Sequence, residues 1–233
     1  METNEILNKL KLLTRTRDEI RFVDDYKGVP MEFNASVSSV FGNTAIFDVF
    51  DYHLASLAFS EQAFIQGDAF PETIQSNVKE INMAKGTATL TDFRYATVPI
   101  VKRKTMRAQP EDAITDVAFK YKDVGILAEL VDISECGIGI YTKTPLRVQA
   151  KENASVHIQI LDPEVSTCLE LELLCDVVNA NRKEDLYGSI RYRTGMQIFP
   201  DEEAKQKITE YVFQRQVKQT YDLNKYYYVH SLQ

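Results

Sequence analysis

The spacing of apolar residues predicts a helix at the start of the chain, followed by a run of short strands. Four apolar residues of segment 5–13 fall on one face of a helix: Ile6, Leu7, Leu10 and Leu13. From residue 29 onward the pattern becomes strand-like, with runs at 31–37, 46–50, 57–65, 73–81 and 87–96. Turn-forming pairs such as Gly42-Asn43 separate these runs. The pattern predicts a small antiparallel barrel over about residues 20–97.

A second β-rich region begins near Ile114. Its predicted strands are residues 114–122, 126–133, 139–142, 155–161, 167–179 and 187–199. Asp201 is a suitable helix N-cap, and a helix is predicted to Gln219 on an apolar face formed by Ala204, Ile208, Tyr211 and Val212. The tail, residues 221–233, shows no clear period.

These patterns predict a mainly β fold built from two small antiparallel β-barrel domains, residues 1–97 and 98–233. A short N-terminal helix and a C-terminal helix complete it. A connector at residues 97–107 opens the second domain, and Pro99 restricts the backbone there.

Composition and charge narrow the classes of function. The chain has 233 residues, 44% of them hydrophobic, enough for a sizeable core. No run of about twenty apolar residues occurs, and residues 1–11 do not resemble a secretory signal, so we expect a cytoplasmic protein without membrane insertion. Cys136, Cys168 and Cys175 share no metal-ligand spacing, and free thiols are expected. The net charge of −7 argues against a nucleic-acid partner.

The connector carries a local basic cluster. Lys102, Arg103, Lys104 and Arg107 have no acidic residue among them, and Arg103 and Arg107 form an RxxxR motif. Two guanidiniums on a connector can wrap a ligand that bears two phosphates and can stack on a purine. A solvated basic linker is the alternative, and the spacing alone is weak evidence because Arg17 and Arg21 repeat it in a helical context.

A second motif, DxSxxG, ends an apolar strand at Asp132, Ser134 and Gly137. Asp132 can accept a hydrogen bond from a guanine edge or hold an arginine in place, and Ser134 offers a hydroxyl. Gly137 allows a positive φ and close approach to the backbone. The same residue types are also typical of a tight turn. The two motifs are separated by a length that fits about two strands.

In this order, RKTMR followed by DISECG resembles the signature of the PilZ family of cyclic di-GMP receptors. Residues 194–199 resemble a late strand of that fold, and residues 208–215 resemble the helix after it. The β-rich N-terminal half and the motif at the domain junction resemble the YcgR-like subgroup, whose N-terminal domain is a split barrel. The PilZ resemblance covers about residues 98–219.

The resemblance implies a ligand, cyclic di-GMP, and a set of ligand-binding residues: Arg103, Arg107, Asp132, Ser134 and Gly137, with Lys102 and Lys104 as weaker candidates. No cofactor and no metal are expected. Ligand binding would wrap the connector around the nucleotide, change the interdomain arrangement and regulate a protein partner. By analogy that partner belongs to the flagellar motor or to surface-attachment (biofilm) machinery. Self-association through strand edges or the tyrosine-rich tail stays open.

The sequence leaves three other classes of function. A PilZ-like adaptor that does not bind nucleotide is the main alternative, because Glu111 and Asp112 lie close to the expected anion site. No nucleophile–base pair or metal set supports an enzyme, since the histidines are scattered at His53, His157 and His230. A single-stranded nucleic-acid binder would fit a small barrel but not the acidic pI near 5.1.

Overall fold

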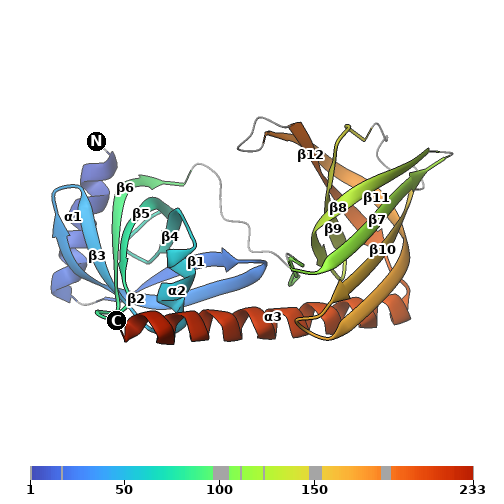
Figure 1. Ribbon diagram of the computed structural model, residues 1–233. Helices are drawn as coiled ribbons and strands as arrows, with labels where there is room; N and C mark the ends of the chain where they lie inside the picture. Colours follow the sequence, from blue (N-terminus) through green and yellow to red (C-terminus); the bar gives the residue numbers. More distant parts are fainter. Residues whose placement is uncertain are drawn as a thin grey trace. The chain divides into compact units, whose positions relative to one another are not determined.

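The computed structural model describes residues 2–16, 18–96, 105–110, 112–122, 124–146, 154–184 and 190–232. The chain divides into two compact units, Met1–Arg103 with Gln219–Gln233, and Lys104–Lys218. Each unit contains a closed barrel of six antiparallel strands (Figure 1). The predicted fold class, two small antiparallel barrels with N-terminal and C-terminal helices, is confirmed.

The first unit places its strands around an aromatic core. Its elements are α1 (Glu2–Thr16), β1 (Ile20–Tyr26), β2 (Val29–Phe41), β3 (Thr44–Val49), α2 (Asp51–Ala58), β4 (Gln62–Gln66), β5 (Ile74–Asn82) and β6 (Thr87–Tyr95). The barrel order is β1-β2-β3-β6-β5-β4, and α1 packs against β2 and β6. Inside, Phe22 stacks on Phe33 with ring centroids 5.4 Å apart and meets Phe47 edge-on. Such aromatic pairs add packing energy beyond the area that they bury.

One strand prediction in this unit was wrong at its start. Residues 57–65 were predicted as a strand, but α2 extends to Ala58 and the strand begins only at Gln62. Leu54, Ala55 and Leu57 are all fully buried on this helix. A short apolar run fits a buried helix as well as a strand, so periodicity alone could not separate the two.

The second unit holds β7 (Ile114–Tyr121), β8 (Val124–Ser134), β9 (Gly137–Thr142), β10 (Ala154–Asp162), β11 (Thr167–Glu184) and β12 (Ile190–Phe199). The barrel order is β10-β11-β12-β9-β8-β7. Consequently β8, β9 and β12 lie side by side although β12 comes much later in the sequence (Figure 1).

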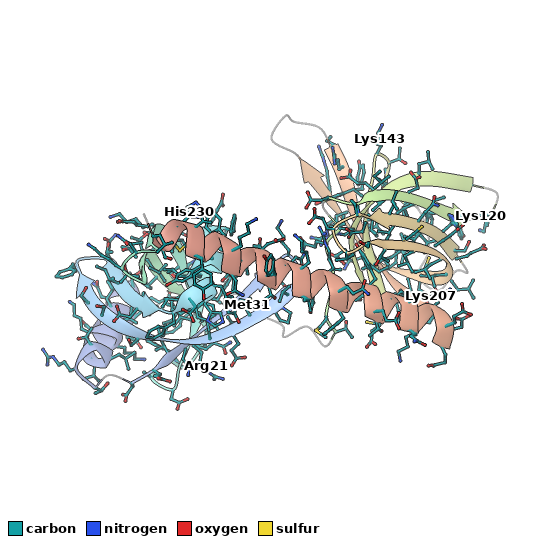
Figure 2. The ribbon with its side chains drawn as sticks, turned by 60° about the horizontal axis from the view of Figure 1, so that its bottom comes forward. Arg21, Met31, Lys120, Lys143, Lys207 and His230 are labelled. Carbon is teal, nitrogen blue, oxygen red and sulfur yellow. The ribbon has the colours of Figure 1, made fainter. Side chains whose placement is uncertain are left out.

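The long helix α3 (Glu202–Ser231) begins directly after Asp201, the residue predicted as its N-cap. Asp201 Oδ1 accepts a hydrogen bond of 2.8 Å from the Ala204 N–H, as an N-cap side chain does. Its first half, marked by Lys207 in Figure 2, contributes Ile208, Tyr211 and Val212 to the core of the second unit.

The predicted end of α3 at Gln219 was wrong, since the helix continues to Ser231. Leu223, Tyr226 and Tyr227 pack in the core of the first unit, and His230 (labelled in Figure 2) stacks on Tyr226. These positions follow the i, i+3, i+4, i+7 spacing of a helix, which the three consecutive tyrosines obscured. Within the described residues, no helix is long and apolar enough to cross a bilayer.

Candidate functional site

The turn between β8 and β9 is held by the serine of the DxSxxG motif. The fully buried Ser134 donates a hydrogen bond of 3.0 Å from Oγ to the carbonyl oxygen of Gly137. Gly137 does not use its freedom to adopt a positive φ, because the described glycines with positive φ are Gly28, Gly42 and Gly86. Gly137 is needed for another reason. A Cβ there would lie 3.0 Å from the carbonyl oxygen of Met196 on β12.

Two arginines share the carboxylate of Asp132 at the end of β8. Arg107 Nη1 lies 2.8 Å from Oδ1, and Arg193 Nη2 of β12 lies 2.8 Å from Oδ2. The Asp132 side chain is 1% exposed, whereas those of Arg107 and Arg193 are 32% and 37% exposed. A buried carboxylate therefore orients two guanidiniums that still reach solvent.

The charges of this cluster leave a net positive site. Two guanidiniums and one carboxylate give an excess of one positive charge, in a chain whose formal net charge is −7. Each guanidinium gives one nitrogen to Asp132 and keeps further N–H donors for a ligand. Asp132 already fixes the positions of both guanidiniums. Ligand binding therefore costs less side-chain conformational entropy than it would at two mobile arginines.

A surface pocket of about 420 Å³ lies beside these arginines, and both line it. Its volume is in the range usual for small-molecule sites. Its lining includes Gly139 and Gly195, which are direct partners on β9 and β12. A Cβ on Gly139 would lie 3.1 Å from Asp132 Oδ2, and one on Gly195 would lie 2.8 Å from Asn179 Oδ1. The two glycines therefore leave room for the Asp132 and Asn179 side chains beside the pocket.

The structure brings some of the predicted residues together. Arg107 and Asp132 form an ion pair, Gly137 lines the pocket, and Ser134 is buried beneath the turn. Arg103, Lys102 and Lys104 lie outside the described residues, so their roles stay predictions.

Arg193 is the residue that sequence reasoning missed. It stands directly before the segment 194–199 that resembled the family, and the available signal was a basic residue next to that segment. Only the pairing of β12 with β9 places it beside Asp132.

The neighbouring acids and cysteines differ in their surroundings. Asp112 lies 3.5 Å from Arg215 and Glu111 lies outside the described residues. Burial raises the pKa of the Cys175 thiol to about 11, whereas Cys136 is exposed and lines the pocket. In the part of the chain that the structure describes, no group of three or more His, Cys, Asp or Glu residues could hold a metal ion.

Fold and site together define a β-barrel domain with a positively charged pocket on its outer surface. Residues 102–214 match the PilZ domain family. This match confirms the resemblance to the PilZ family that the sequence showed.

Several solved two-domain structures are similar to this chain. The K. pneumonia MrkH–c-di-GMP complex has 13% identity and a TM-score of 0.45, and the alignment covers 93% of this chain and 95% of that chain. E. coli YcgR in complex with c-di-GMP has 12% identity and a TM-score of 0.42, with 95% of each chain covered. The Bacillus subtilis inhibitor of motility MotI/DgrA has 14% identity and a TM-score of 0.39, with 86% and 96% covered. No curated protein matches the chain.

Proposed function

We propose that this protein is a receptor for cyclic di-GMP that binds the nucleotide on its PilZ domain. The observation that supports this most is the pair of guanidiniums, Arg107 and Arg193, which Asp132 orients and which line the same pocket. The PilZ family match over residues 102–214 supports the same ligand.

The pocket offers one chemical group for each part of such a ligand. Cyclic di-GMP carries two phosphates and two flat guanine bases. The guanidiniums of Arg107 and Arg193 can donate charge-assisted hydrogen bonds to phosphate oxygens. A guanine can lie over Gly139 and Gly195, within reach of the Asn179 amide that lines the same pocket. Arg103 on the connector would add a third cation.

Binding would act as a signal rather than lead to a reaction. In this proposal the connector closes over the nucleotide, the arrangement of the two units changes, and a protein partner responds. A ligand can shift that equilibrium only as far as its contacts differ between the two arrangements. A partner in motility or surface-attachment machinery is the expectation carried by the YcgR-like resemblance.

Arginine substitutions test the site. Arg107→Ala or Arg193→Ala should weaken cyclic di-GMP binding at least about tenfold, which corresponds to about 1.4 kcal/mol each. The matched control is Arg191→Ala, because Arg191 stands on the same strand, pairs with Glu129 at 2.8 Å and does not line the pocket. It should change the affinity by about twofold at most, since exposed charges are screened over distance.

The comparison is made by isothermal titration calorimetry of the full chain. Equal weakening by all three substitutions would show a diffuse electrostatic effect and contradict the proposed site. If the unsubstituted protein does not bind, the nucleotide-independent adaptor replaces the receptor.

A further inference from the structure

Helix α3 contacts the proposed ligand site through the Gln216 side chain. Gln216 is only 7% exposed, and its Nε2 donates a hydrogen bond of 3.0 Å to the carbonyl oxygen of Arg107. The helix thus contacts the backbone of an arginine whose guanidinium lines the pocket.

The same stretch of α3 is fixed to the barrel by a buried polar cluster. The fully buried Asp162 accepts a hydrogen bond of 2.9 Å from the Tyr211 hydroxyl and lies 3.4 Å from Arg215 Nη1. Burial, together with the Asp162 charge, raises the pKa of Tyr211 and keeps its hydroxyl protonated as a donor. Because buried charges are costly unless paired, this cluster sets where Gln216 lies along the barrel.

The chain next to Arg107 is also fixed on its C-terminal side. The buried Ala108 exchanges two backbone hydrogen bonds with Ile133, of 2.9 and 3.0 Å. Ile133 is the residue after Asp132. Arg107 is therefore held by its guanidinium at Asp132, by its neighbour at Ile133 and by its carbonyl at Gln216.

We propose that Gln216 is a positioning residue for Arg107 and links the docking of α3 to ligand binding; this inference rests on the proposed function. The Gln216 amide holds the Arg107 backbone so that the guanidinium stays in the pocket. Coupling of this kind is reciprocal, so a nucleotide that orders Arg107 also strengthens the docking of α3.

Gln216→Met tests the first half of the proposal, because methionine keeps the length and apolar stem of the side chain and removes the amide donor. The loss of one neutral hydrogen bond should weaken cyclic di-GMP binding by about fivefold. Gln214→Met is the matched control, since Gln214 is exposed on the same helix and accepts a hydrogen bond from Thr167. It should leave the affinity within about twofold of the unsubstituted protein.

A second readout needs no ligand. The Arg107 Nε is buried and has no hydrogen-bond partner among the described residues. Because its N–H is shielded from solvent, its proton exchanges slowly with water and its ¹H–¹⁵N signal can be observed by NMR. In the free protein, Gln216→Met should lower the ¹H–¹⁵N heteronuclear NOE of this group, and Gln214→Met should not. If Gln216→Met does not fold, Gln216→Asn keeps an amide that is one methylene too short to reach and gives the same reading.

The two readouts separate the two proposals. If the unsubstituted protein does not bind cyclic di-GMP, the receptor function is wrong, and the NOE still tests whether Gln216 orders Arg107. An unchanged NOE in Gln216→Met overturns the inference. An unchanged affinity in a protein that does bind the nucleotide overturns it as well.

Discussion

Replacing Asp132 by asparagine removes the charge that orients Arg107 and Arg193 while it preserves the shape of the side chain. Asp132 accepts two hydrogen bonds of 2.8 Å, and a hydrogen bond to a charged group contributes about 1.5–3 kcal/mol. The guanidiniums are 32% and 37% exposed, so solvent screens them and the lower end of that range applies.

Asparagine can still accept one of the two hydrogen bonds, but its amide nitrogen faces the other guanidinium. We therefore expect Asp132→Asn to lower the free energy of unfolding of the second unit by about 2 kcal/mol. Ligand affinity should fall as well, because both arginines lose their fixed positions.

Urea denaturation followed by circular dichroism measures the loss. Amide hydrogen exchange on β8 and β9 assigns it to the second unit, since two units need not unfold together. Asp116→Asn is the control, because Asp116 is exposed on β7 and its side chain makes no hydrogen bond or ion pair with any described residue. It should change stability by no more than about 0.5 kcal/mol. Equal effects of the two substitutions would refute the account of Asp132.

Two further predictions concern Gly139 in the lining of the pocket and His53 in the first unit. Gly139→Ala should weaken nucleotide binding several-fold, because the added Cβ would lie 3.1 Å from the Asp132 carboxylate, whereas Gly125→Ala on β8 adds a methyl in open space and should not. Calorimetry of both variants checks this, and equal affinities would contradict it. Burial lowers the pKa of His53 below 6.5, and the charge of Asp51 opposes this only in part. A depressed pKa means that the neutral imidazole stabilises the fold above pH 6.5 and that this stability is lost as the pH falls through the folded pKa. The melting temperature should therefore drop on acidification below pH 6.5 more steeply in the unsubstituted chain than in His53→Phe, and identical slopes would count against it.

The local motifs identified two residues that the structure brings together in the candidate site, because each motif is compact in sequence. The RxxxR and DxSxxG motifs identified Arg107 and Asp132, whose Nη1 and Oδ1 atoms lie 2.8 Å apart. The stretch of sequence between the two motifs is long enough for one hairpin. Short antiparallel connections bring such motifs together without knowledge of the rest of the fold.

Arg193 could not be predicted in the same way. Its contact with Asp132 depends on β12 pairing with β9, a register between segments far apart in the sequence. The contact that restricts Gly137 could not be predicted for a similar reason, since the carbonyl oxygen that a side chain would meet belongs to Met196 on β12.

The helices show a different limit. The buried face of α2 is too short to establish a period, and the pattern of Leu223, Tyr226 and Tyr227 was hidden by neighbouring tyrosines. Which residues of a mixed segment face the core depends on packing that a single sequence does not contain.

The central claim is that this PilZ domain binds cyclic di-GMP. Isothermal titration calorimetry of the full chain with cyclic di-GMP, and with GTP as the control ligand, tests it most directly. The account predicts saturable binding at micromolar or tighter affinity for cyclic di-GMP, no comparable binding of GTP, and at least about tenfold weaker binding in Arg107→Ala. No heat and no thermal shift at high ligand concentration would contradict the claim.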